Sequence, residues 1–238
     1  MALKQDIIDK VTSIIDGKFT ITNTTTVPDI SDTRLTFGNT GLLFKAAVLY
    51  IDMRGSTKIL HKHNRETVSK IHMAYFHTVV KIANSLGGEV RSFNGDSLLV
   101  FFQGTTKQRI RDAVKAAMQI KYMLSDSTVG INTILEKYSA IDFGIGLDYG
   151  NILCTKVGVG GNSNNQDLFW VGQSVNKAVI ISDACKANTH IGISDIVHTN
   201  LLDEVRNSKG VDMWNSEWLT YNDTHHLFYK TSYHWTVS

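Results

Sequence analysis

The sequence has little proline, little cysteine and no long apolar run. It contains one proline, Pro28, and two cysteines, Cys154 and Cys185, in 238 residues. Two cysteines make no disulfide framework, and no CxxC or Cys/His cluster indicates zinc, so we expect a reduced, cytosolic protein. No uncharged apolar stretch approaches the roughly 20 residues that a membrane span needs. The first residues lead into no long apolar run, so we expect no signal peptide.

An excess of one charge is also missing. The formal net charge is +2, which argues against general nucleic-acid binding, because such proteins carry a strongly basic face. The apolar fraction of 42% is ordinary for a globular protein. A chain of this length forms one large domain, or one domain with an appendage.

The chain divides near residue 42. Apolar residues in 3–16 have the one-sided spacing of a short amphipathic helix. Residues 17–41 are rich in Thr, Asp, Asn and Gly and contain the proline, which is typical of an extended linker. We therefore expect an N-terminal helix and linker over 1–41 and a compact domain over 42–238.

Beyond residue 42, strand and helix patterns alternate. In chain order the sequence first predicts a strand at 44–52, one helix from 56 to 86, strands at 89–94 and 97–103, and a helix at 106–125. A strand pair at 140–148 and 150–158 follows, then a Gly/Asn-rich loop at 158–167 and a helix at 172–186. The remaining elements are a strand at 190–194, a short helix to 202 and irregular segments that finish the sheet. The β-α-β-β-α-β order predicts an α+β fold of the ferredoxin-like kind, with helices on one face of a mainly antiparallel sheet.

Two aspartates occupy unusual positions in this pattern. Asp52 ends the first predicted strand, and Asp96 lies at the tip of the predicted hairpin. In this topology both can face the same edge of the sheet, where their charges would repel unless a cation lay between them. Oxygen ligands of this kind bind hard divalent cations together with substrate phosphates, so the pair predicts a two-metal phosphoryl-transfer site. The alternatives are a helix cap for Asp52 and a turn residue for Asp96.

The segment after Asp52 predicts a phosphate contact. Met53 and Arg54 lead into Gly55, Ser56 and Thr57, which open a predicted helix. Free N–H groups and the helix dipole favour anions at such a place.

Three motifs resemble those of the class III nucleotidyl cyclases. Residues 49–57 (LYIDMRGST) are similar to the first metal motif, 94–96 (NGD) to the second and 171–178 (VGQSVNKA) to the third. The resemblance implies a class III cyclase catalytic domain, in which the ribose 3′-oxygen attacks the α-phosphorus of a nucleoside triphosphate and pyrophosphate leaves. It also implies that Asp52 and Asp96 hold two Mg²⁺ or Mn²⁺ ions, with the carbonyl of Met53 as a further ligand. A diguanylate cyclase relative is disfavoured, since no Gly-Gly-Asp/Glu-Glu-Phe hairpin is present.

The positions that read a purine base in these cyclases differ here. They are occupied by Ser92 and Phe169, and Tyr50 stands where the family usually has Phe. A smaller pocket with hydroxyls suits a pyrimidine, because Ser and Tyr hydroxyls both donate and accept hydrogen bonds. The alternative is that Tyr50 and Phe169 are core aromatics.

The whole pattern resembles the pyrimidine nucleotide cyclases of bacterial anti-phage defence, and so does the lead-in over residues 32–39 (DTRLTFGN). The resemblance implies conversion of UTP to cyclic UMP, a second messenger for a separate effector protein. Cyclic CMP from CTP and a purine product are the alternatives.

One departure concerns catalysis. The arginine that stabilises the transition state in this family is replaced by Ile180. Lys177, Arg54 and Lys230 are candidate replacements, and we do not choose among them. The remaining alternative is a degenerate dimer that binds nucleotide without turnover.

Asn176, in the third motif, implies a partner. In the family this motif completes the active site of the facing subunit, so we expect a homodimer with composite sites in which residues 158–167 form the arm that reaches across. The candidate catalytic residues are Asp52, Asp96 and Asn176. The candidate nucleotide-binding residues are Tyr50, Arg54, Gly55, Ser56, Thr57, Ser92, Asn94, Phe169 and Lys177.

Overall fold

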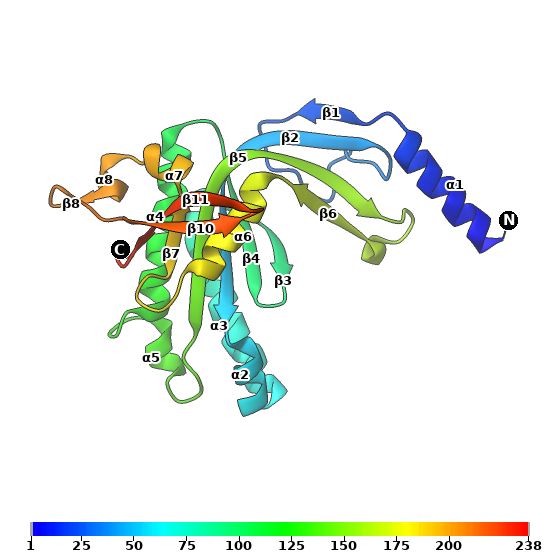
Figure 1. The fold of residues 1–238 in the computed structure, drawn as a ribbon. Helices are drawn as coiled ribbons and strands as arrows, with labels where there is room; N and C mark the ends of the chain where they lie inside the picture. Colours follow the sequence, from blue (N-terminus) through cyan, green and yellow to red (C-terminus); the bar gives the residue numbers. More distant parts are fainter. Residues whose placement is uncertain (1, 238) are drawn as a thin grey trace.

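The computed structural model describes residues 2–237 and builds them around a nine-stranded, mostly antiparallel sheet (Figure 1). Seven strands follow the order β10-β11-β7-β5-β2-β4-β3, while β1 adds to β2 and β6 adds to β5. The strands are β1 (Thr20–Asn23), β2 (Thr40–Arg54), β3 (Glu89–Asn94), β4 (Ser97–Gln103), β5 (Asp142–Gly158), β6 (Gln166–Val171), β7 (Ile191–Ser194), β10 (Asn215–Tyr221) and β11 (Thr224–Thr231). A separate two-stranded pair joins β8 (Asn207–Ser208) to β9 (Val211–Asp212).

Eight α-helices accompany the sheet in the described residues. They are α1 (Leu3–Asp16), α2 (Ser56–Lys62), α3 (Arg65–Ser85), α4 (Lys107–Ser125), α5 (Ile131–Leu135), α6 (Gln173–Ala184), α7 (Asp195–Thr199) and α8 (Asp203–Arg206). No helix within residues 2–237 is long and apolar enough to cross a membrane.

The alternation of side chains along β2 decides what covers each face of the sheet. Its odd-numbered residues, Leu49 and Ile51 among them, pack with α3 and α4 in the main core. Its even-numbered residues, such as Ala46 and Val48, pack on the other side with Ala178 of α6. Successive strand residues point to opposite faces, so Tyr50, Asp52 and Arg54 share the face that α6 covers. The predicted α+β class is confirmed, but helices lie on both faces, because α6 packs opposite α3 and α4.

Two glycines allow α6 to lie directly on β5. A Cβ at Gly146 would overlap the carbonyl oxygen of Ala178, and one at Gly144 would overlap that of Ser182. Any larger residue here would push α6 off the sheet.

The structure differs from the expected elements in two places. The single helix predicted from 56 to 86 is interrupted at His63, which has extended backbone. The second helix, α3, begins at Arg65 after the capping residue Asn64, whose side chain accepts the N–H of Thr67. The strand pair at 140–148 and 150–158 is one continuous strand, β5, in which Tyr149 and Gly150 stay paired with β2. An Asp-Tyr-Gly sequence favours a turn locally, but the long partner strand keeps this one extended.

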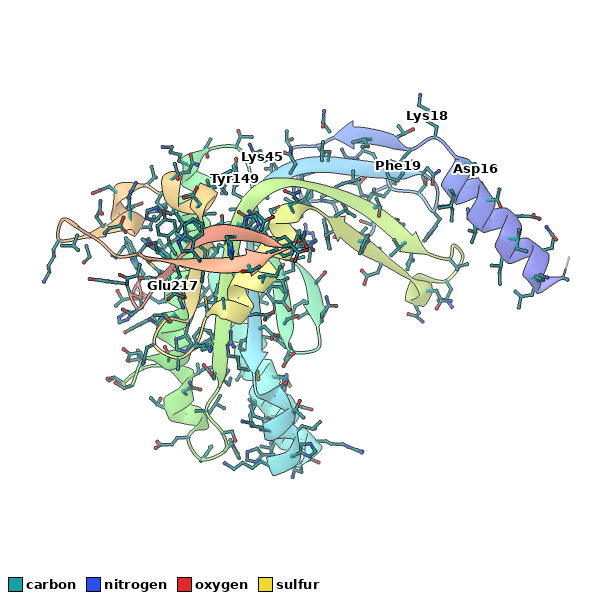
Figure 2. The ribbon with its side chains drawn as sticks, in the orientation of Figure 1. Asp16, Lys18, Phe19, Lys45, Tyr149 and Glu217 are labelled. Atoms are coloured by element: carbon teal, nitrogen blue, oxygen red, sulfur yellow. The ribbon has the colours of Figure 1, made fainter. Side chains whose placement is uncertain are left out.

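Residues 17–41 are more structured than the linker that the sequence predicts. β1 pairs in parallel with the start of β2, and Val27 and Leu35 are buried in the second core. The N-terminal part of β2 and the C-terminal part of β5, together with β1 and β6, form an arm that carries α1 at its far end (Figure 1). Lys45 and Tyr149 lie beside each other on these two strands, with the Lys45 ammonium 4.9 Å from the centre of the Tyr149 ring (Figure 2). The division of the chain at residue 42 stays a prediction.

Candidate active site

The end of β2 and the turn between β3 and β4 bring the two predicted aspartates together. Asp52 is paired with Ser97 of β4, the residue directly after Asp96. The backbone N–H of Met53 donates to the carbonyl oxygen of Asp96 at 3.4 Å. Both aspartates are half-buried. The turn at Asn94 and Gly95 thus serves to place Asp96 next to the end of the neighbouring strand.

The Asp52 carboxyl is electrostatically unfavourable in its charged form. Burial, together with the neighbouring Asp96 and Asp183 and against a smaller opposite effect of Arg54, raises the pKa of Asp52 to about 6. A carboxylate with a raised pKa beside a second acid gains most from a cation between the two.

Tyr50 lies two residues before Asp52 on the same face of β2, and it is half-buried. Burial raises the pKa of its hydroxyl, which lies near the Ser97 side chain and the charges of Asp52, Asp183 and Asp96. The hydroxyl therefore stays neutral beside the acidic pair, while the side chain also packs against the core on the α6 side of the sheet. A role of Tyr50 in reading the base stays a prediction.

The donor set at this end of the sheet suits hard divalent cations. Asp52 and Asp96 offer carboxylate oxygens, and the backbone of Met53 follows the first of them. No cluster of three or more His, Cys, Asp or Glu side chains able to hold a metal occurs within residues 2–237. Two carboxylates fit Mg²⁺ or Mn²⁺, which complete their shells with substrate phosphates and water. The predicted metal ligands Asp52, Met53 and Asp96 are consistent with this arrangement and stay a prediction.

The helix opening after Asp52 lies beside the same turn. Gly55 has a positive φ of 70° and its carbonyl accepts the N–H groups of Lys58 and Ile59. A cavity of about 290 Å³ is lined by Ser56, Thr57, Leu60, Val68, His72, Gly95 and Asp96. Ser56 and Thr57 therefore share a cavity with Asp96, although a phosphate contact there stays a prediction.

Arg54 is placed differently from a residue waiting for phosphate. Its guanidinium Nη2 donates to the carbonyl oxygens of Ser182 at 2.6 Å and Asp183 at 3.1 Å. As a candidate replacement for the missing transition-state arginine, Arg54 would have to leave these bonds.

The third motif opens helix α6. Asn176 is exposed, Lys177 is half-buried, and Ile180 follows one turn later on the helix. Lys177 lines a separate cavity of about 450 Å³ together with Asp148, Tyr149, Gly150, Asn151, Gln173, Ser174 and Ile196. Within residues 2–237, no hydrogen bond or ion pair joins Asn176 or Lys177 to the acidic pair of the same chain.

The remaining predicted residues are spread along the sheet. Ser92 is half-buried on β3 opposite Leu99, and Asn94 is exposed at the turn. Phe169, on β6 of the arm, is 57% exposed, so it is not a core aromatic. Lys230, on β11, forms an ion pair of 2.7 Å with Glu217 on β10. A phosphate role for Lys230 would compete with this pair.

Asp183 was missed at the sequence level. It acts on the pKa of both Asp52 and Tyr50 from the last turn of α6. A lone aspartate in a helix is typical of a solvated face, and only the packing of α6 onto β2 reveals it. Ser97, whose side chain lowers the pKa of the Tyr50 hydroxyl, was missed for the same reason.

The fold is that of the class III nucleotidyl cyclase catalytic domains. The guanylyl cyclase Cya2 superposes with a TM-score of 0.66 and 20% identity over 79% of this chain and 92% of that one. The adenylyl cyclase CyaB from P. aeruginosa has a TM-score of 0.66 and 20% identity over 80% and 95% of the two chains.

Among characterised relatives the similarity is to pyrimidine enzymes over the whole chain. The uridylate cyclase of Xanthomonas perforans is 28% identical over 242 residues, and that of Burkholderia cepacia is 27% identical over 241, with full coverage of both chains in each case. No family model matches the chain. The resemblance to class III cyclases, which the three motifs predict, and to their pyrimidine type, which the whole pattern predicts, is thereby confirmed.

Proposed function

We propose that this protein is a metal-dependent nucleotidyl cyclase that converts UTP to 3′,5′-cyclic UMP and pyrophosphate. The observation that carries the proposal is the convergence of Asp52 and Asp96 at one end of the sheet. Full-length similarity to uridylate cyclases supports both the reaction and the base.

The reaction forms one bond and breaks another at a single phosphorus. The ribose 3′-oxygen loses its proton and attacks the α-phosphorus, and the bond to the bridging oxygen of pyrophosphate breaks. When bound, two divalent cations would supply charge neutralisation and favour the deprotonated 3′-oxygen. Asp52 and Asp96 would hold the cations and thereby position the triphosphate, and such positioning accounts for most of phosphoryl-transfer catalysis.

The proposed base choice rests on three positions that the resemblance assigns to base recognition. Tyr50 presents a neutral hydroxyl next to the acidic pair, and the purine-reading positions carry Ser92 and Phe169. Uracil presents both donors and acceptors, which hydroxyls can meet.

A homodimer completes the site in this proposal. Asn176 is exposed and unconnected to the acidic pair of its own chain, so it is free to serve the facing protomer. The arm of β5 and β6 projects from the body and offers a surface for that contact (Figure 1). The cyclic nucleotide would then act on a separate effector in anti-phage defence.

The decisive experiment incubates the purified protein with Mn²⁺ and each of the four ribonucleoside triphosphates. We expect cyclic UMP as the dominant product and none after chelation of the cation. Cyclic CMP as the dominant product would support the proposed cyclisation but replace uracil by cytosine as the base. A dominant purine product would reject the pyrimidine assignment.

Binding without turnover is the second candidate, and Ile180 is the observation that favours it. The helix position that carries the family's arginine offers no donor to the developing charge. This candidate expects tight triphosphate binding with no release of pyrophosphate from any base.

A further inference from the structure

The side chain of Arg54 closes the end of helix α6. Its two acceptors, the carbonyls of Ser182 and Asp183, belong to the last turn of a helix that ends at Ala184. That turn contains no basic residue of its own. Carbonyl groups at a helix C-terminus carry partial negative charge. The Ser182 carbonyl also accepts the N–H of Cys185, and Arg54 supplies the missing cation from β2.

The neighbouring backbone leaves room for this contact. Gly144, which is paired with Asp52, would bring a Cβ to 2.6 Å from Nη2 of Arg54. The Nε of Arg54 is buried and has no hydrogen-bond partner within the described residues. An unpaired buried donor costs free energy of folding, so the guanidinium group loses hydration of its Nε when it occupies this position.

We propose that Arg54 is a positioning residue that acts through α6. By fixing the end of this helix against β2, it sets where α6 presents Asn176, which lies less than two turns away. The inference rests on the proposed dimer, in which Asp52 of one chain works with Asn176 of the other. Arg54 then acts on the composite site that contains the Asn176 of its own chain and the Asp52 of the facing chain, and not on the site that contains the Asp52 of its own chain.

The alternative is a direct role of Arg54 at its own metal strand. Arg54 lowers the pKa of Asp52, so its charge is felt there. The two roles differ in which of the two composite sites suffers when Arg54 is removed.

Mixed dimers separate the roles. Two chains with different affinity tags are co-produced and purified through both tags, so that each dimer carries one copy of each variant. The benchmark pairs Asp52→Ala with Asn176→Ala and retains one intact site.

We expect the cyclase activity of the pair Arg54→Ala with Asp52→Ala to match that of the benchmark within about twofold. The pair Arg54→Ala with Asn176→Ala should be ten- to a hundred-fold lower, roughly the cost of a misplaced catalytic group.

The other outcomes each overturn the inference. The reversed pattern assigns Arg54 to its own metal strand, and an equal loss in both pairs assigns it a general structural role. An inactive benchmark would reject the composite dimer itself, and with it the present inference. A reversed pattern with an active benchmark leaves the proposed function standing.

Two further readouts do not depend on turnover. In the Arg54→Ala homodimer, amide hydrogen exchange should rise in the last turn of α6 and stay unchanged in β2. Arg54→Lys should restore protection only in part, because one ammonium lacks the planar fork that bonds two carbonyls at once. Unchanged exchange in α6 would contradict the contact's role.

Discussion

Asp52 lies beside Asp96 at one end of the sheet, although the two residues come from a strand end and a hairpin turn 44 positions apart in the sequence. The backbone bond from Met53 to Asp96 fixes the two segments to each other. Burial and the nearby acids raise the pKa of Asp52 to about 6. The site is therefore assembled at a cost to the stability of the fold, which a bound cation or protonation of Asp52 would remove.

The pH dependence of stability should show this cost. A carboxyl with a raised pKa binds its proton more tightly in the folded state, so its stabilising effect is complete below pH 3.8 and is lost as the pH rises to about 6. Asp52→Asn should thus melt like the wild type at low pH and at a higher temperature above pH 6, without added cation. Thermal unfolding of both proteins from pH 4 to 8 measures the difference.

Asp126 provides a matched control with the opposite sign. The backbone N–H groups of Val129 and Thr128 lower the pKa of Asp126. Asp126→Asn should therefore lose stability relative to the wild type at neutral pH and regain it in acid. If Asp52→Asn followed the same course as Asp126→Asn, the strained acidic pair would be the wrong description.

Removing either acid should abolish turnover while leaving the fold intact. Asp52→Ala and Asp96→Ala each delete a charge that the triphosphate's cations require, and we expect losses of about a thousandfold or more in cyclic nucleotide formation. Circular dichroism and thermal unfolding check the fold. Glu217→Ala, which frees Lys230 from its ion pair, should keep the metal site. Full activity in Asp52→Ala or Asp96→Ala would take that residue out of the site.

Much of the fold was predictable because its signals are local. The hairpin over 89–103 follows from Asn94-Gly95 between two apolar strands, and the structure has its strands at the predicted bounds. The acidic pair was also predictable, because each aspartate stands at the end of an apolar strand pattern. These features need only short-range rules of turn and strand chemistry.

The features that were missed depend on long-range packing. Tyr149 and Gly150 look like a turn, yet they continue β5 because β2 supplies partners along its whole length. The placement of α6 on the opposite face rests on the glycines of β5, whose role appears only when Ala178 lies above Gly146. Arg54 and Asp183 meet for the same reason, which no local pattern contains.

Gly146→Ala should test how closely α6 must pack. The added Cβ would overlap the carbonyl oxygen of Ala178, so α6 must shift away from β5. Overpacking of this kind costs about 1–3 kcal/mol of unfolding free energy. Denaturant unfolding measures it, with Gly160→Ala as control, since a Cβ there meets Phe37 at an ordinary 3.4 Å. Equal unfolding free energies of the two variants would mean that α6 can move away from β5 without loss of stability.

Tyr50 should control the choice of base through its hydroxyl and its volume. Tyr50→Phe removes only the hydroxyl near Ser97 and the acidic pair, so we expect weaker use of UTP with purines still excluded. Tyr50→Ala also opens the space of the ring, so it should admit ATP and GTP and narrow the preference for UTP by about 1–3 kcal/mol, or 10- to 200-fold. Competition among the four triphosphates, scored as the ratio of kcat/KM values, measures both effects. An unaltered substrate profile in Tyr50→Ala would move base selection to Ser92 and Phe169, because these occupy the other positions at which the purine cyclases read their base.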